Sequence, residues 1–177
     1  MGATTTAAEL GRAFPDVPVV DSSGAHVRDS VDSDPRLVVA TPGAEPAPES
    51  GYACAVILDA VSSLSRPGLA AVEQTVDRWM AILALVRSVR DGGRAVVVGP
   101  SEDAALQAMV RNDPAGWAAR ELTDRREARF PPAVPCGIVD GDPKAVASAA
   151  QRLGEWFGTD LEAVSYTHLT LPTKRIV

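Results

Sequence analysis

The sequence predicts an α/β fold with a parallel sheet. Residues 52–58 (YACAVIL) and 94–98 (RAVVV) are apolar runs without polar alternation, which is typical of strands covered on both faces. Between them, apolar residues recur at three- and four-residue spacings, the pattern of an amphipathic helix. Strands that alternate with helices in this way favour helices layered on a parallel sheet.

The first forty residues are expected to run helix, strand, turn and strand. A helix over residues 3–14, stopped by Pro15, has one apolar face: Ala7, Leu10, Ala13 and Phe14. Residues 17–20 predict a short strand, 21–35 predict turns, and 37–40 predict a second apolar strand. Three prolines then require an extended loop: Pro42, Pro46 and Pro48.

Three helices are expected after the strand at residues 52–58. The first spans 68–90 and ends at Gly92-Gly93; its apolar positions are Leu69, Val72, Val76, Trp79, Met80, Leu83 and Val86. The second, through residue 111, has Ser101 as its N-cap, with acidic residues in its first turn. The third begins at Asp113-Pro114 and ends before Pro131-Pro132. Trp117 and Leu122, which are spaced roughly to share a face with Phe130 beyond them, are predicted to be buried. Arg125 and Arg126 are predicted to be exposed.

Length and composition limit the function classes. The 177 residues are 46% hydrophobic and 23% charged, which suits one core and an appended element. No apolar stretch is long enough to span a membrane, and the N-terminus lacks the pattern of a secretory signal, so the cytoplasm is the expected compartment. The two cysteines, Cys54 and Cys136, are interpreted as small buried hydrophobes, because neither a disulfide framework nor a cysteine zinc site is expected.

The last fourteen residues, 164–177 (VSYTHLTLPTKRIV), differ in composition from the rest. They resemble the translation of a transposon-based sequencing adapter, so we exclude them from fold reasoning and expect the natural protein to be cut near Ala163. Without Lys174 and Arg175, 15 basic residues face 23 acidic ones, a net charge of −8. Such a fragment repels phosphate, so a non-specific grip on nucleic acid by this piece alone is disfavoured.

Few side chains suggest a site. Neither a Walker phosphate loop nor a G-x-G-x-x-G motif is present. Gly99-Pro100-Ser101 is interpreted as a helix cap rather than an anion site, and His26 as a solvated loop residue. Asp59 follows a predicted strand, where it either contacts a ligand or, as we favour, caps the next loop. Arg87 and Arg90 are interpreted as a solvated helix end that complements the helix dipole.

Several stretches, in order, resemble the primosomal protein N′ (PriA) family over residues 5–154. They are TAAELGRAFPDVPV, LVVATPGAEPAPESGYACAVILD, AVEQTVDRWMAILALVR, GGRAVVVG and NDPAGWAARELTDRREARFPPAV. The similarity is greatest to the branch from high-GC bacteria in which the helicase motifs have degenerated. It implies that residues 1–112 are a degenerate second RecA-like helicase lobe. Residues 113–163 would be a connecting helix and the start of a truncated C-terminal domain.

The departures from the family imply lost catalysis. Active members carry a G-T-Q-M-x-x-K-G-H-like loop where this chain has ATPGAEPAPESG, and Q-x-x-G-R-x-G-R where it has LALVRSVR. Arg87 and Arg90 would match the two arginines that reach ATP phosphates, while Leu83 replaces the glutamine, and Val86 and Val89 the glycines. We therefore expect no catalytic residue here and only a relic nucleotide-binding role for the two arginines. The family's zinc-binding cysteines are absent, so zinc, and possibly ATP, would belong to the full-length parent.

The resemblance implies a fragment of a DNA replication-restart protein. In its complete form, this protein would bind forked DNA and primosome proteins, with the degenerate lobe as a scaffold. The alternative is a lobe of an ATP-dependent 3′–5′ DNA helicase that retains some ATPase activity. A third reading, an unrelated small α/β enzyme, would require a polar pocket near Asp59 with a second catalytic side chain.

Overall fold

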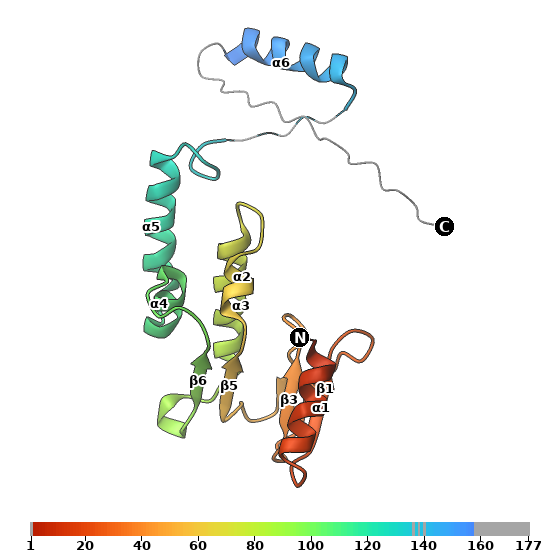
Figure 1. Cartoon of the computed structure of the whole chain (residues 1–177). Coiled ribbons are helices and arrows are strands. Elements are labelled where there is room, and N and C mark those ends of the chain that lie inside the picture. The colour runs from red at the N-terminus through yellow and green to blue at the C-terminus, as the bar shows by residue number, and fades with distance from the viewer. Residues whose placement is uncertain (1, 136, 138, 140, 158–177) are drawn as a thin grey trace, which may run out of the picture. The chain divides into compact units, whose positions relative to one another are not determined.

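The structure, a computed structural model, describes residues 2–135, 137, 139 and 141–157 (Figure 1). By its contacts the chain divides into two units, Met1–Val134 and Pro135–Val177, and each is described by itself. The predicted domain limits, 1–112, 113–163 and 164–177, stay predictions. The elements of the first unit are, in order, α1 (Ala3–Ala13), β1 (Val19–Ser22), β2 (Ser30–Val31), β3 (Leu37–Ala40), β4 (Ala47–Pro48), β5 (Cys54–Ile57), α2 (Ala60–Leu64), α3 (Ala71–Ala84), the 3₁₀ turn η1 (Val89–Asp91), β6 (Arg94–Val97), α4 (Ala104–Arg111) and α5 (Pro114–Glu127).

All the strand pairs in the described residues are parallel, which confirms the α/β class. β1 pairs with β3 from Val19 opposite Leu37, and β5 pairs with β6 from Cys54 opposite Arg94. A third, two-residue pair joins β2 to β4, in segments that we expected to be only turn and loop. The described strands thus form separate two-stranded sheets rather than one continuous sheet.

The hydrophobic core lies between β5–β6 and the helices. α2 packs on α3, α3 packs on α4 and α5, and α4 packs on α5, whereas α1 packs separately on β1 and β3. The buried core residues are Ala60, Val76, Trp79, Ala105, Leu106, Ala108, Met109 and Trp117. Ile57 and Val97, which pair across β5 and β6, pack against this cluster from the strands.

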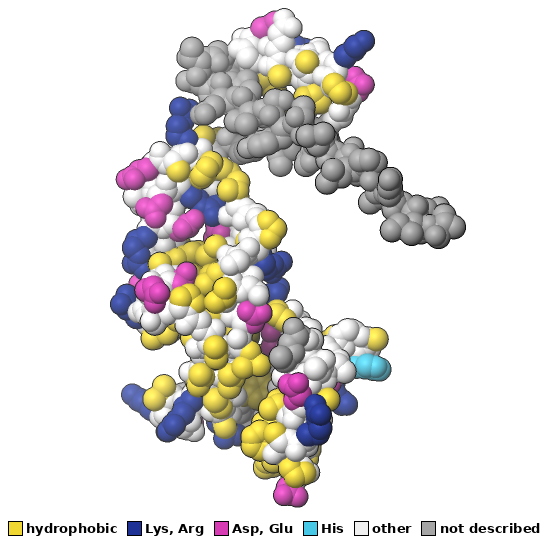
Figure 2. Space-filling model, viewed as in Figure 1, with side chains coloured by type: hydrophobic (Ala, Val, Ile, Leu, Met, Phe, Trp, Pro, Cys, Tyr) yellow, Lys and Arg dark blue, Asp and Glu magenta, His cyan; other side chains and the backbone are white. Residues whose placement is uncertain are grey.

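The opposite face of β5 and β6 is uncovered, which corrects the prediction of strands buried on both faces. Val56 is 54% exposed and Val96, its partner across the strands, is 48% exposed. Cys54 is also exposed, so the interpretation of this thiol as a buried hydrophobe was wrong. Hydrophobic side chains gather over β5 and β6 in the space-filling view (Figure 2). The sequence pattern was that of a covered strand, but the described residues place helices on only one side of the pair.

Two aspartates begin the last helices of this unit. Asp113 Oδ1 accepts a hydrogen bond from Gly116 N at 2.8 Å, which confirms the predicted N-cap of α5. α4 is capped by Asp103 instead of Ser101, because Asp103 Oδ1 accepts from the backbone N–H groups of Ala105 (2.9 Å) and Leu106 (3.1 Å). The helix therefore starts later than we expected, and Ser101 lies exposed in the loop before it.

α3 is shorter at both ends than the predicted helix over 68–90. It ends at Ala84, and the backbone then turns into a parallel bridge with Tyr52. Tyr52 N donates to Leu85 O at 2.8 Å, and Arg87 N donates to Tyr52 O at 2.9 Å. The apolar spacing continues past Ala84, but these carbonyl and N–H groups pair with the chain before β5 instead of continuing the helix.

α5 confirms only part of its predicted apolar face. Trp117 is buried at 6% exposure and Arg126 is exposed, as predicted. Leu122 is exposed and the side chain of Arg125 is only 11% exposed, so those two expectations were wrong. Phe130 is exposed as well. Arg125 is buried because its charge is paired within the unit, as described below.

The described part of the second unit contains α6 (Pro143–Phe157). Asp142 Oδ1 accepts from Lys144 N at 2.9 Å near its start, and the Arg152 guanidinium lies 5.4 Å from the ring centre of Trp156. Cys136 and the predicted adapter-derived tail, residues 164–177, lie outside the described residues. Within the described residues, no helix combines the length and apolar character needed to cross a membrane.

Candidate functional site around Arg87 and Arg90

Arg87 lies between α3 and β6, on the amino-terminal side of the strands, and is held by its own chain. Its Nε donates to two carbonyl oxygens, Gly51 O at 2.9 Å and Ser50 O at 3.1 Å. Its backbone N–H donates to Tyr52 O. The guanidinium thus ties the end of the 40–51 loop to the chain that leaves α3. Arg87 is exposed, as expected, but it lies beyond the end of α3 instead of in its last turn.

Arg90 lies in the exposed turn η1, not one helical turn from Arg87 at a helix end as we expected. Ser88 caps this turn by accepting from Asp91 N, and Gly92, with φ of 81°, ends it. Val89, which replaces a glycine in the family pattern, is 88% exposed. The branched side chain of Val89 therefore projects at a position where a glycine would let a ligand approach the backbone closely.

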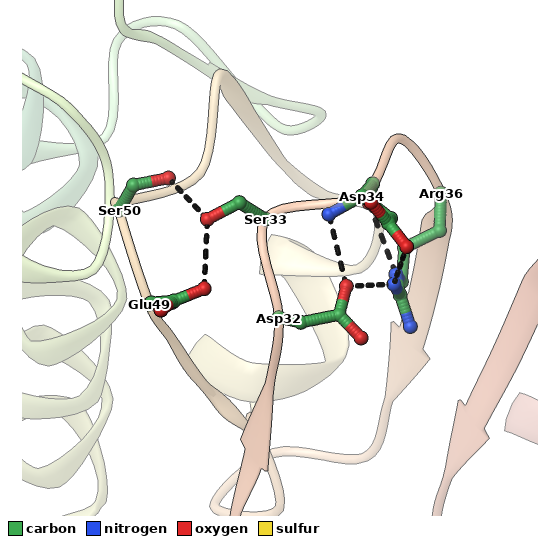
Figure 3. A network of polar contacts seen from close by, with 6 residues as sticks. All are labelled: Asp32, Ser33, Asp34, Arg36, Glu49 and Ser50. Carbon is green, nitrogen blue, oxygen red and sulfur yellow. Dashed lines mark hydrogen bonds and ion pairs between the residues drawn. The ribbon is translucent and has the colours of Figure 1, made fainter.

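A shallow hollow of about 250 Å³ lies beside Arg87. Two of its polar lining residues, Ser33 and Ser50, belong to a network that joins the segment after β2 to the segment after β4 (Figure 3). In this network Ser33 Oγ donates to Glu49 Oε2 at 3.0 Å and lies 3.1 Å from Ser50 Oγ. Ser50 also supplies one of the carbonyls bound by Arg87, so the network and the arginine share one loop.

The charges in this hollow are mostly satisfied by one another. Arg36 pairs with Asp32 and donates from Nε to Asp34 O at 3.0 Å. The backbone N–H of Asp34, and after it the Arg36 guanidinium, hold the pKa of Asp32 below its ordinary value of 3.8. Asp32 is therefore ionised at neutral pH, and its pairing with Arg36 leaves that guanidinium less available to a phosphate.

The other candidate residues lie apart from Arg87. Asp59 follows the carboxyl end of β5, whereas Arg87 lies on its amino-terminal side. Asp59 Oδ1 accepts from Ser62 N at 3.2 Å, and this bond lowers the pKa of Asp59. Asp59 therefore has a capping role, as expected, but it caps the short helix α2 where we expected a loop. His26 is exposed in the loop after β1, as expected.

Arg125 is the polar centre that sequence reasoning missed. Its guanidinium pairs with Glu73 of α3 and with Glu121 Oε1 at 2.8 Å, and it donates to the carbonyls of Pro131 (2.8 Å) and Leu69. These contacts hold α5 and the Pro131-Pro132 turn against the start of α3. The spacing of Glu121 and Arg125 by four residues was the available sequence signal, but it indicates a helical pair and not its burial.

Gly93 provides a test of the packing beneath Arg87. A Cβ at Gly93 would overlap the carbonyl oxygen of Arg87, and Gly93 is buried. We expect Gly93→Ala to lower the free energy of unfolding by about 3 kcal/mol, because the backbone between α3 and β6 must move.

The matched control is Gly92→Ala, where no atom lies within 4 Å of the added Cβ. It incurs only the left-handed backbone strain of about 1 kcal/mol. Urea denaturation followed by far-UV circular dichroism compares the two. A loss at Gly93 no larger than that at Gly92 would contradict the close approach.

The geometry defines a parallel α/β protein. The segment that joins α3 to β6 carries Arg87, and the hydrogen bonds of Arg87 to Ser50 and Gly51 attach this segment to the loop before β5. The chain is 44% identical over 152 residues to "Probable replication restart protein PriA" of Mycobacterium leprae (strain TN), a match that covers 86% of this chain and 23% of that protein. It is 45% identical over 141 residues to the protein of the same name of Mycobacterium tuberculosis (strain ATCC 25618 / H37Rv), covering 80% of this chain and 22% of that protein. No protein-family model and no solved structure matches the chain.

The resemblance to the PriA family is thereby confirmed. The chain is a PriA-like sequence that corresponds to one segment of these replication restart proteins. It spans less than a quarter of the length of these curated relatives.

Proposed function

We propose that this segment acts as a scaffold within a PriA-like replication restart protein of the cytoplasm. The complete protein would bind forked DNA and primosome proteins, and this lobe would hold its domains in place without hydrolysing ATP. The observation that carries the proposal is the state of Arg87, whose Nε is hydrogen-bonded to the carbonyls of Ser50 and Gly51.

An arginine that stabilises phosphoryl transfer must direct its donors at the phosphate. At Arg87, Nε serves the chain's own backbone, and one terminal nitrogen lies 3.5 Å from Ser50 Oγ. The loop that supplies these partners is the segment that replaces the family's G-T-Q-M-x-x-K-G-H-like motif. The sequence change in the loop and the hydrogen bonds of Arg87 to that loop therefore both support a lobe that does not hydrolyse ATP.

The surroundings also fit a nucleotide poorly. Val89 projects into solvent where the family pattern has a glycine, and Arg36, the other arginine that lines the hollow beside Arg87, is already paired with Asp32. Among the described residues, no group of three or more His, Cys, Asp or Glu side chains could hold a metal ion. Zinc and ATP, where the complete protein uses them, would be bound by residues outside this part of the chain.

The fork-binding part of the proposal is tested in a PriA-length protein that carries this segment. We expect Arg87→Ala combined with Arg90→Ala to leave the affinity for forked DNA within a few-fold, because Arg87 holds a loop and the acidic segment repels phosphate. Fluorescence anisotropy with a labelled fork, at one fixed salt concentration, measures this affinity.

The control removes equal charge at two other exposed arginines, Arg111→Ala with Arg126→Ala. A loss of affinity that is much larger for the Arg87 and Arg90 pair than for this control would show that the two arginines contact DNA. The scaffold proposal would then be wrong for this loop.

A further inference from the structure

The uncovered side of the β5–β6 pair forms one contiguous apolar surface. Four hydrophobic side chains on it are about half exposed or more: Val56 at 54%, Leu58 at 61%, Val96 at 48% and Val98 at 53%. Cys54 and Arg94, which pair across the first position of the two strands, are exposed at one end of the same surface. We call these six residues the outer face.

The alternation of side chains places the outer face opposite the core. Ile57 and Val97 pack against the helical core, so their neighbours along each strand point to the other side. β5 and β6 pair in parallel, and parallel strands in α/β proteins are covered on both faces. The core covers one face here, and nothing among the described residues of this unit covers the other.

We propose that the outer face is a docking surface for an amphipathic helix supplied by the part of a PriA-length protein outside this chain. A helix is the element that covers the faces of parallel sheets. Its apolar stripe would lie on Val56, Leu58, Val96 and Val98. An acidic side chain near one end of the helix would face Arg94, because complementary charge at the edge of an interface sets its orientation.

The relatives are long enough to contain a helix that could cover the outer face. The matched segment covers 22–23% of the replication restart proteins, so most of such a protein lies outside it. Nucleic acid does not suit the outer face, because four of its six residues are aliphatic and only Arg94 is cationic. The inference rests on the relation of this chain to a PriA-length protein, and it holds whether or not the lobe hydrolyses ATP.

Cys54 is a reporter at the edge of this surface. Its thiol is exposed in the 177-residue chain, so it should react with iodoacetamide in the native chain nearly as fast as in urea. The test is a PriA-length protein in which this chain replaces the homologous segment of the Mycobacterium leprae relative. Peptide mass spectrometry follows alkylation at Cys54 alone. We expect alkylation in the native protein at least about tenfold slower than in urea, because a docked helix must open before the thiol reacts.

Two pairs of threonine substitutions separate docking from a general loss of stability. Val56→Thr with Val96→Thr changes only the outer face. It should leave the Tm of the 177-residue chain within about 2 °C and restore fast alkylation in the PriA-length protein. Ile57→Thr with Val97→Thr changes the core face of the same strands and should lower the Tm in both proteins.

Cys54 that reacts in the native PriA-length protein as fast as in urea overturns the proposal. The proposal is also overturned if Cys54 of the 177-residue chain is itself protected from alkylation and this protection rises with the concentration of the chain. The outer face is then covered by a second copy of the chain. Where the exchanged protein does not fold, the remaining part of the relative is produced separately and added to the 177-residue chain. The same protection of Cys54 is then expected, and its absence at saturating concentration counts against the proposal.

Discussion

Replacing Trp117 by alanine is expected to lower the free energy of unfolding by about 3–5 kcal/mol. The indole is 6% exposed and belongs to the core cluster with Leu106 and Met109 of α4. Truncation removes the apolar contacts by which α5 packs on α4 and leaves a cavity that the surrounding helices fill only in part. Urea denaturation followed by far-UV circular dichroism measures the loss without depending on the deleted fluorophore.

Trp156→Ala is the matched control for this substitution. Trp156 is 69% exposed on α6, in the second unit. Its removal should change stability by no more than about 0.5 kcal/mol. Equal effects at the two positions would show that Trp117 does not form part of a core.

Replacing Arg125 by methionine is expected to cost about 3 kcal/mol. Methionine keeps much of the side-chain volume but removes the partner of Glu73, whose Oε2 is already buried without a hydrogen bond. The carboxylate of Glu73 would then be left largely buried beside an apolar side chain. The carbonyl of Pro131 would lose its donor as well.

The double substitution Glu73→Leu with Arg125→Met should recover part of that loss, because the Glu73 carboxylate is removed and only Glu121, whose side chain is 32% exposed, is left without its partner. Arg126→Met, at the exposed neighbouring position, is the control and should be nearly neutral. Thermal unfolding of the unmodified protein, Glu73→Leu, Arg125→Met and the double variant gives the coupling between the two residues. A double variant no more stable than Arg125→Met would contradict the ion pair as the source of the effect.

Local chemistry in the sequence predicted the elements and several of their ends. Asp113 followed by proline specifies a helix start through one side-chain bond to Gly116, and this requires nothing from the rest of the chain. The strand at Leu37–Ala40 was predicted with its observed bounds for the same reason, since apolar β-branched residues there are bounded by turns. The α/β class followed from the alternation of such segments.

Features that depend on distant partners could not be predicted. The pattern of β5 indicates a strand covered on both faces, but it cannot say which polypeptide supplies the second cover. The end of α3 is set by Tyr52, which takes the carbonyl of Leu85. Arg125 was expected to be solvated because its main partner, Glu73, lies on another helix.

The sequence identified the residues of the candidate site but not their positions or partners. Spacing identified Arg87 and Arg90, but it placed both at a helix end. Arg87 is instead bound to Ser50 and Gly51, because the loop that replaces the family motif returns to the start of β5 and supplies those carbonyls. That contact joins segments far apart along the chain, and no periodic pattern records it.

ATP turnover by a PriA-length protein that carries this segment tests the scaffold account most directly. The rate is measured with forked DNA present, for the unmodified protein and for Arg87→Ala with Arg90→Ala. An arginine that stabilises phosphoryl transfer contributes roughly 10³ to 10⁵ in rate. Because Arg87 is bound to its own loop, the account predicts background turnover in both proteins. Measurable hydrolysis that the double substitution abolishes would contradict it and establish the lobe as part of a motor.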